Sequence, residues 1–398
     1  MQSTAPVPSL FVSPQSLAAT FAAVPDPRRA GSVRYPLAAI LAMAVAAILA
    51  NHHSVLAIAE WGADQSASLL AQLGFPTDRT PCQSTLQRLF AKLDGDALSA
   101  ALAAAVTPRA RSTPNTLQGV AIDGKAQRGR LRFPGGGCPV HALTAYCHET
   151  GLVLAHEPIA APAGTDRGEA ELTVAPALLA RLDWQGRVLT GDALFCQRDL
   201  CRRVLAAGGD YLLAVKANQP ALHDAITFLF DPPPATGVLP LHDRRIAETL
   251  DYGHGRTRER RMLTASTDLV GYLDWPGHAQ ALRIERTWVE HDAIHRAVRY
   301  AITSLSSERA DAARLLGLKR GHWGIENGLH RTKDVTLCED ASLIHAGQGP
   351  TVMALLRDAA VNVLHLAGVT SITARRRRHS QHPERAVALV VTPLPTHA

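Results

Sequence analysis

Apolar side chains recur at helical spacing along the first 110 residues of the chain. Residues 36–50 form an almost unbroken apolar, alanine-rich run, and apolar positions then continue at Leu56, Ala59 and Trp61. This pattern predicts a group of helices. The apolar run ends at polar residues 51–53 and is shorter than the roughly 20 residues that a membrane-spanning helix needs. We therefore expect a buried helix and no membrane partner.

Residues 80–106 predict two short helices joined by a turn, with an apolar face that includes Leu86, Leu89 and Phe90. Such a pair can present one helix to the major groove of DNA, although most short helical pairs only pack into a core. Both interpretations stay open. Residues 1–110 are accordingly predicted to be an all-α N-terminal domain with a DNA-binding role as one alternative.

The period of the pattern changes after residue 110. Residues 119–123, 140–148 and 151–160 read as three strands, and 168–182, 186–195, 197–209 and 210–218 as helix, strand, helix and strand. Three strands followed by alternating elements are typical of an α/β domain, in which an antiparallel meander leads into parallel units. We assign residues 111–220 to the first part of this domain.

The later part of the chain divides into three further segments. Alternating positions predict β-strands, so residues 221–300 are interpreted as a β-rich insertion. Residues 301–370 are expected to complete the α/β domain, with a long helix that begins at Ser306 or Ser307 and another after Pro350. The arginine-rich residues 371–398 are predicted to be a mobile basic tail.

Composition restricts the class of protein. The 398 residues are 46% hydrophobic and 19% charged, with a formal net charge of +6, which is typical of a globular protein and favours an acidic partner such as nucleic acid. The six cysteines form no Cys-x-x-Cys pair, and the N-terminus lacks the pattern of a signal peptide. We expect reduced thiols, no zinc site and a cytoplasmic location.

Three acidic residues stand out by position. Asp123 ends the first predicted strand, Asp192 ends the fourth, and Glu326 lies on the late helix. Acids at the carboxyl ends of neighbouring strands can converge, and clustered carboxylates are suited to Mg²⁺, which prefers oxygen ligands. Each also has a plainer interpretation, because such an Asp is commonly a turn or cap residue and a helical Glu is commonly solvated.

Six motifs in order resemble a known family. They are "FAAVPDPRRAGSVRYPLAAILAMAVAAILANHHSVLAIAEW", "IDGKAQRG", "TGDALFCQRDL", "GGDYLLAVKANQ", "GHGRTRERR" and "GHWGIENGLHRTKDVTLCEDAS". Together they resemble the ISAs family of bacterial insertion-sequence transposases, which includes the H-repeat-associated proteins. The resemblance implies a ribonuclease-H-like catalytic domain with a mixed sheet, interrupted by the β-rich insertion. It also implies a DDE triad of Asp123, Asp192 and Glu326, which would be both the catalytic residues and the metal ligands.

The resemblance also suggests which residues contact DNA. Related transposases carry Tyr-x2-Arg-x3-Glu-x6-Lys around the last acid, where this chain has Lys319, His322, Glu326 and Lys333. It keeps Glu171 but has Ala170 where relatives have Asn, and Arg331 where many have Trp. Basic residues next to the triad, in the insertion and in this pattern are the predicted DNA-binding set: Lys125, Arg128, Arg130, Lys216, Arg256, Arg258, Arg260, His322 and Lys333. For the three arginines of the insertion, a solvated strand face is the alternative.

The function implied by the resemblance is that of a DNA transposase. It would bind the inverted-repeat ends of an insertion sequence and carry out cleavage and strand transfer with Mg²⁺, or with Mn²⁺ as an alternative ion. Its partners would be element-end and target DNA and a second copy in a synaptic homodimer, at the nucleoid. A nuclease-only protein and an inactive DNA-binding descendant of a transposase are the alternatives.

Overall fold

The computed structural model describes residues 15–110, 116–126, 141–159, 167–233, 241–253, 256–291 and 293–395, with the side chains at 167–168, 253 and 256–258 left aside. The chain divides into two compact units. Unit 1 comprises Met1–Arg109 and Ala346–Ala398, and unit 2 comprises Ala110–His345. The two units are described separately.

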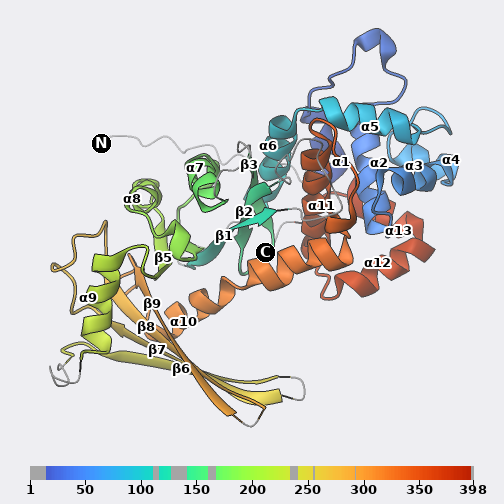
Figure 1. Cartoon of the computed structure of the whole chain (residues 1–398). Coiled ribbons are helices and arrows are strands. Elements are labelled where there is room, and N and C mark those ends of the chain that lie inside the picture. Colours follow the sequence, from blue (N-terminus) through green and yellow to red (C-terminus); the bar gives the residue numbers. More distant parts are fainter. Residues whose placement is uncertain are drawn as a thin grey trace, which may run out of the picture. The chain divides into compact units, whose positions relative to one another are not determined.

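Unit 1 is all-helical in its described part (Figure 1). Its helices are α1 (Leu17–Thr20), α2 (Leu37–Leu49), α3 (Val55–Ala63), α4 (Ala67–Gln72), α5 (Gln83–Lys92), α6 (Gly95–Val106), α11 (Gly349–Leu366), α12 (Ile372–Gln381) and α13 (Pro383–Val391). The apolar run of the sequence is α2, in which every residue except Ala38 is buried. Helices α1, α3, α11 and α13 all pack against it, so α2 is the centre of the core of this unit.

The C-terminal part of the chain differs from its prediction. Helix α11 was expected in the α/β domain, but it packs against α2, α5 and α6 of unit 1. The arginine-rich segment is not a mobile arm in its described part, because it forms α12 and α13. Arg376, 2% exposed, donates a hydrogen bond to the Ile48 carbonyl at 3.0 Å, at the end of α2. A buried arginine satisfies the free carbonyls of a helix C-terminus, a use that charge counting does not reveal.

Unit 2 is built on one nine-stranded sheet in the order β3-β2-β1-β4-β5-β9-β8-β7-β6. The strands are β1 (Gln118–Ala126), β2 (His141–Cys147), β3 (Val153–Ile159), β4 (Arg187–Gly191), β5 (Asp210–Val215), β6 (Arg245–Gly253), β7 (Arg256–Ser266), β8 (Gln280–Glu290) and β9 (Ala293–Thr303). β1, β4 and β5 run parallel, and β2 and β3 add an antiparallel meander to β1. This mixed α/β arrangement is the expected ribonuclease-H-like fold.

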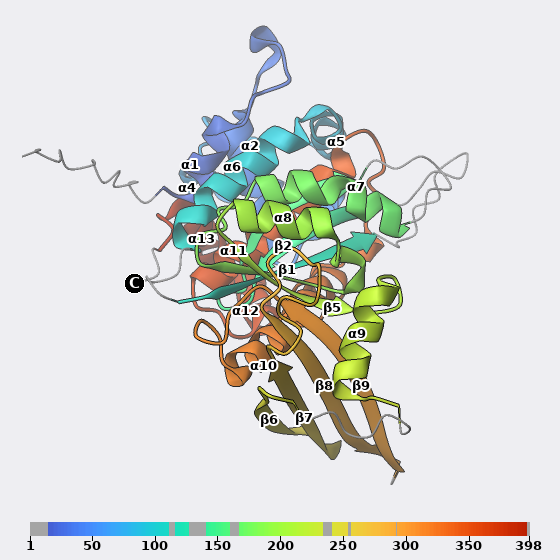
Figure 2. The ribbon, with the colours of Figure 1, turned by 90° about the vertical axis from the view of Figure 1, so that its left-hand side faces the viewer.

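Two helices pack on the sheet, one on the antiparallel meander and one on the parallel part. α7 (Arg167–Ala180) packs on β2 and β3, α8 (Arg198–Ala206) packs on β5, and the two lie side by side (Figure 2). Their place between strands is the one that the helix-strand alternation of the sequence predicted.

The β-rich segment is not separate from this sheet. β9 pairs antiparallel with β5, and β8, β7 and β6 follow outward as long antiparallel strands. Alternate residues of this extension face opposite sides. Leu282, Ile284 and Leu263 pack with α10 (Ala312–Gly321), whereas Arg283 and Tyr300 meet Asp231 at the end of α9 (Pro220–Phe230). The segment therefore continues the sheet of unit 2 rather than forming its own core.

The late helix is shorter than predicted and changes type. Asp311 accepts a hydrogen bond from the Arg314 N–H and caps α10, which ends at Gly321. Two π-helical segments follow, η6 (Ile325–His330) and η7 (Thr332–Thr336), and then the 3-10 turn η8 (Glu339–Ala341). π-Helical turns are rare in proteins, and those that do occur are often found at functional sites. Among the described helices of the chain, none is both long and apolar enough to cross a membrane.

Candidate active site

Asp123 and Asp192 lie just past the point where the parallel pairing of β1 and β4 ends. In the register of β1 and β4, Ala121 lies opposite Thr190, so each Asp comes two residues after this pair. The Asp123 side chain is 27% exposed and Asp192 is exposed. Asp192 also accepts a hydrogen bond from the Leu194 N–H at 2.8 Å and caps the short turn after β4. The capping role does not exclude a role as a metal ligand, because a carboxylate has further lone pairs.

Glu326 reaches the same place from the π-helical segment. η6 packs against β1, and Glu326 is exposed in its first turn. The glycines of this segment allow the close packing: a Cβ at Gly324 or Gly328 would come within 3.1 or 3.2 Å of the Tyr146 ring or hydroxyl on β2. Small residues therefore bring the helix that carries Glu326 onto the sheet.

The pKa of Asp123 responds to the charges of the other two predicted acids and of a fourth acid, Glu171. Burial raises the pKa of Asp123 to about 7, and the negative charges of Glu326, Glu171 and Asp192 add to the rise. A like charge affects a pKa in this way only when it is close. The three acids named from the sequence thus share one electrostatic neighbourhood, and Asp123 is at its centre.

Glu171 was not among the predicted catalytic residues. It lies on α7, accepts from His141 Nε2 at 2.9 Å, and its side chain is 13% exposed. Its carboxylate sits over the Cα of Gly124, where any Cβ would overlap it. Gly124 in the "DGK" motif therefore leaves room for this carboxylate. The sequence held one signal, the acidic "EAEL" segment at the start of a predicted helix.

His330 adds a basic group to this acidic cluster. Its Nδ1 is 3.4 Å from the Asp123 Oδ2. The carboxylates are the donor type that Mg²⁺ prefers. Among the described residues, however, no three His, Cys, Asp or Glu side chains stand close enough together to ligate one ion. Binding of a shared ion would therefore require the acids to draw together.

Lys125 and Lys333, which were predicted to contact DNA, instead form ion pairs with acids of unit 2. Lys125 Nζ is 2.6 Å from Asp334 Oδ1 and 2.9 Å from Glu339 Oε2, and Lys333 Nζ is 3.4 Å from Glu339 Oε1. Glu339 is 1% exposed and Lys333 is 2% exposed. Burial alone would lower the pKa of Lys125, but the carboxylates of Glu339 and Asp334 outweigh it and raise the pKa. These lysines neutralise internal acids and tie β1 to the segment after Glu326.

His322 is also not a surface cation. It is 7% exposed, and its Nδ1 lies 3.2 Å from the Thr190 hydroxyl, which is 3.0 Å from His148 Nε2. Burial, with Lys319 and His148 nearby, lowers the pKa of His322 to about 3. A neutral, enclosed imidazole cannot bind a phosphate as a cation. Its place fixes the helix that carries Glu326 against β4.

Free positive charge borders the acids on another side. A pocket of about 480 Å³ is lined by Asp192 and Glu326 and by Lys216, Arg299 and Lys319. In the described part of the chain, no carboxylate lies within ion-pair distance of these three cations. Burial, and then Arg299, lower the pKa of Lys319 to about 8 despite the opposing effect of Asp192. Lys216, whose contact with DNA stays a prediction, thus lines this pocket with Arg299 and Lys319, which were not among the predicted residues.

A second pocket, of about 390 Å³, shares Arg299, Lys319 and Trp323 with the first. Trp323 is 44% exposed although it is large and apolar. The two pockets are therefore adjacent, with Trp323 in the lining of both, and together they are called the groove. Two other tryptophans of unit 2 have different surroundings: Trp275 is 8% exposed, and Trp288 is stacked on His295.

The remaining predicted DNA-binding residues either do not line this groove or lie outside the residues that the structure describes. Arg128 and Arg130 fall outside the described residues, as do the side chains of Arg256 and Arg258. Arg260 is exposed on β7 and pairs with Glu248 at 2.6 Å. Its contact with DNA stays a prediction.

Comparison with protein families identifies the catalytic unit. The family described as "Transposase DDE domain" matches residues 115–363. The chain belongs to this family. The associated family "DDE_Tnp_1-associated" matches residues 18–105 of the transposase, which cover α1 to α6.

The relatives of this transposase extend along most of its length. "Putative transposase YncI" of Escherichia coli O157:H7 is 29% identical over 360 residues, 89% of this chain and 88% of its own. "H repeat-associated putative transposase YhhI" of Escherichia coli (strain K12) is 26% identical over 91% of this chain and 93% of its own. A protein from the dhlA 3′ region of Xanthobacter autotrophicus is 32% identical over 67% and 86%. The piggyBac transposase synaptic complex with hairpin DNA has a TM-score of 0.41 at 11% identity, over 93% of this chain and 80% of its own.

Proposed function

We propose that this transposase binds the ends of its mobile element and carries out metal-dependent cleavage and joining of DNA strands. The observation that carries the proposal is the placement of Asp123 and Asp192 just past the paired ends of β1 and β4, with Glu326 on the segment that packs against β1. Burial, and then the charges of Glu326, Glu171 and Asp192, raise the pKa of Asp123. Carboxylates held together against their repulsion are a common feature of sites that bind a cation. Synapsis of two element ends would involve two copies of the chain.

Asp123, Asp192 and Glu326 would hold Mg²⁺ or Mn²⁺. Bound there, divalent ions activate the attacking oxygen and stabilise the leaving oxygen of phosphoryl transfer. Asp123 must lose its proton to act as a ligand. The positive charge of the bound cation would favour this loss, whereas the negative charges of Glu171 and the other acids oppose it. Glu171, fixed by His141, would hold Asp123 in place and keep the local charge negative.

The reacting strand would follow the groove beside the acids. Lys216, Arg299 and Lys319 lack carboxylate partners in the described structure and line the pocket with Asp192 and Glu326. They would hold the phosphates on either side of the scissile bond. Trp323, exposed between the two pockets, would stack on a base of that strand. The buried Lys125, His322 and Lys333 would position the acids instead of contacting DNA.

The test uses a labelled duplex that carries the element end and Mg²⁺. We expect the wild-type chain to nick the duplex, and Asp192→Asn to lose nicking by several orders of magnitude while it binds the duplex normally, because the groove cations remain. Asp199→Asn on α8, a surface acid paired with Arg203, is the matched control and should cleave normally. Unchanged cleavage by Asp192→Asn would refute the mechanism.

Strand transfer separates transposition from simple cleavage. A pre-nicked duplex with a free 3′-hydroxyl, mixed with a circular target, should yield joined products. Nicking without joining would assign the chain as a nuclease, and binding without nicking would make it an inactive descendant.

A further inference from the structure

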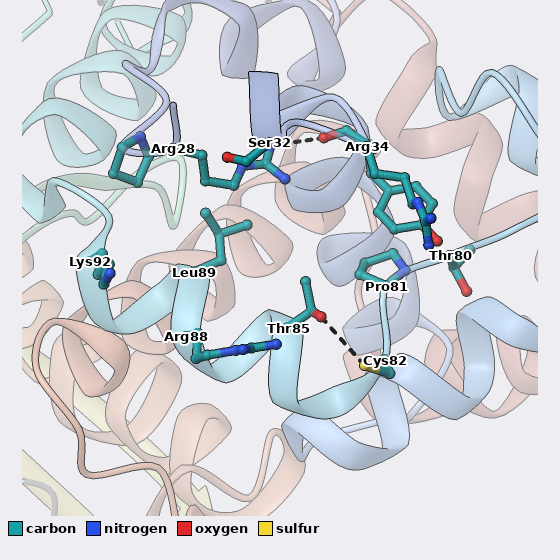
Figure 3. A pocket seen from close by; sticks show the side chains of 12 residues that line it. Arg28, Ser32, Arg34, Thr80, Pro81, Cys82, Thr85, Arg88, Leu89 and Lys92 are labelled. Atoms are coloured by element: carbon teal, nitrogen blue, oxygen red, sulfur yellow. Dashed lines mark hydrogen bonds between the residues drawn. The ribbon is translucent and has the colours of Figure 1, made fainter. Parts of the chain in front are cut away.

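Unit 1 contains a basic pocket that the catalytic proposal does not use. The pocket has a volume of about 590 Å³ and lies between the segment 27–35 and helix α5. Figure 3 shows Arg28, Ser32 and Arg34 on one side and Cys82, Thr85, Arg88 and Lys92 on the other, with Leu89 and Pro81 between them. Four cations line it, and no Asp or Glu does.

Three of these cations are exposed and have no acidic partner in the described part of the chain: Arg34, Arg88 and Lys92. The fourth, Arg28, is held by Asp26 at 2.7 Å and donates to the Tyr35 carbonyl at 2.8 Å. Arg28 therefore fixes the segment 27–35, whereas the other three can accept an external anion. The Arg88 Nε donates to the Ser84 carbonyl at 3.1 Å, which directs its guanidinium along α5.

The charges of α5 are arranged at a cost to the helix. Arg88 and Lys92 are four residues apart, so they lie next to each other on the same face, and like charges there destabilise a helix. The sequence of α5, QSTLQRLFAK, contains no acid to offset them. Another face buries Leu86 and Phe90 in the core, and the buried Leu89 forms the floor between them and the pocket. Helix α5 is thus anchored by one face and presents unpaired positive charge on the other.

The polar side chains of the lining are those that contact phosphate. Besides the cations, the hydroxyls of Ser32, Thr80 and Thr85 line the pocket. Arginine, lysine, serine and threonine are the side chains that proteins use for contacts with the DNA backbone. The lining itself contains no acid, and the neighbouring Asp26 is paired with Arg28.

We propose that this pocket of unit 1 binds the phosphate backbone of duplex DNA through Arg34, Arg88 and Lys92, as a second contact independent of the acidic site. The inference rests on the proposed function only in that the chain binds DNA. The predicted helix pair at residues 80–106 would then contact the backbone through its first helix and not only pack into the core.

Cys82 provides a probe inside the pocket. Its Sγ lies 3.4 Å from both the Ser84 and the Thr85 hydroxyls, which lower the pKa of the thiol to about 6. The thiolate therefore predominates at neutral pH and reacts with iodoacetamide. DNA phosphates over the pocket would shield it and raise its pKa, and both effects slow alkylation.

The experiment measures duplex binding in EDTA by fluorescence anisotropy over a range of salt concentrations, so that cleavage plays no part. Each lost phosphate contact reduces the slope of log Kd against log[salt] by about 1. Arg34→Gln with Arg88→Gln should reduce it by about 2, and Arg34→Lys with Arg88→Lys should restore it. The matched control is Arg378→Gln with Arg385→Gln, two exposed arginines of α12 and α13 outside the pocket.

Alkylation of Cys82, followed by peptide mass spectrometry, gives the second readout. We expect duplex DNA to slow it at least several-fold in the full-length wild-type chain and in Asp192→Asn, but not in the Arg34 and Arg88 double glutamine variant. Inorganic phosphate at the same phosphate concentration should have no such effect. Equal protection by inorganic phosphate would assign a small-anion site and overturn the proposal.

Two results would separate this proposal from the catalytic one. If the double glutamine variant binds DNA with the wild-type salt slope, or if the control loses as much, the pocket has no role and the catalytic proposal stands. If the wild-type chain binds no duplex at all, both proposals fail.

Discussion

Asp123 is the residue at which the like charges of the site act most strongly. Its pKa is raised from the usual 3.8 to about 7, with burial as the first cause and Glu326, Glu171 and Asp192 after it. The sequence placed three of these acids but gave no sign of the pKa. The value depends on distances across β1, β4, α7 and η6 that only the fold sets.

The raised pKa predicts a dependence of stability on pH. Between about pH 4 and 7 the folded chain keeps a proton on Asp123 that the unfolded chain has lost, so its free energy of unfolding falls as pH rises, by up to about 1.4 kcal/mol per pH unit. Denaturation in EDTA between pH 5 and 8 measures this. Asp123→Asn should flatten the dependence, and Mg²⁺ should stabilise the wild-type chain most above pH 7. An unchanged slope in Asp123→Asn would contradict the assignment.

Gly124 is expected to be as important as the acid next to it. In Gly124→Ala the new Cβ overlaps the Glu171 carboxylate, which must leave its place beside β1. By analogy with groups that support metal ligands, we expect Mn²⁺ affinity to fall by roughly 10- to 100-fold, as measured by electron paramagnetic resonance.

Gly317→Ala is the matched control for this substitution. A Cβ at Gly317, within α10, meets nothing within 4 Å. It should leave Mn²⁺ affinity unchanged and stabilise the chain by roughly 1 kcal/mol through helix propensity. An equal loss of Mn²⁺ affinity in both variants would mean that the lack of a side chain at Gly124 is not required for metal binding.

At the scale of elements, two lysines from two parallel strands of the same sheet have different surroundings. Lys125 on β1 is paired with Glu339 and Asp334 inside the fold, whereas Lys216 after β5 is exposed beside Asp192. The sequence put both on a DNA-binding rim, because each follows an apolar strand. Their difference arises from the acidic turn η8, which lies more than two hundred residues after β1 in the chain.

This difference predicts that a Lys→Met substitution affects mainly stability at residue 125 and mainly DNA binding at residue 216. Lys125→Met leaves Glu339 buried with less compensation and should cost about 3–5 kcal/mol of unfolding free energy, with the salt dependence of DNA binding unchanged. Lys216→Met should change stability by less than about 0.5 kcal/mol and reduce the salt slope by about 1. Chemical denaturation and anisotropy titrations measure both, and the reverse pattern would show that Lys125 is the DNA contact.

The π-helical segment explains why helical spacing was an unreliable guide near Glu326. A regular helix through residue 330 would place His322, Glu326, His330 and Lys333 on one face. Instead these side chains have separate partners: His322, at the end of α10, meets Thr190, whereas His330 of η6 meets Asp123 and Lys333 of η7 meets Glu339. Nothing in the local sequence distinguishes this segment from an α-helix.

At the scale of the whole molecule, the strands and helices of residues 118–215 were predictable because their apolar periods are clear. The continuation of the sheet through β9 to β6 was not, since alternation predicts strands but not their neighbours. The folding of the arginine-rich C-terminus was also hidden, because Arg376 uses its charge to satisfy the end of α2, 328 residues away in the chain.

The central claim is that acids from β1, β4 and η6 jointly bind a divalent ion that acts on DNA. The most direct measurement is Mn²⁺ binding at pH 7.5 by the wild-type chain, by Asp123→Asn, Asp192→Asn and Glu326→Gln, and by the control Asp199→Asn. We expect each of the three site variants to lose affinity by at least about tenfold and the control to bind as the wild type does. Wild-type affinity in all three site variants would show that these acids share no ion.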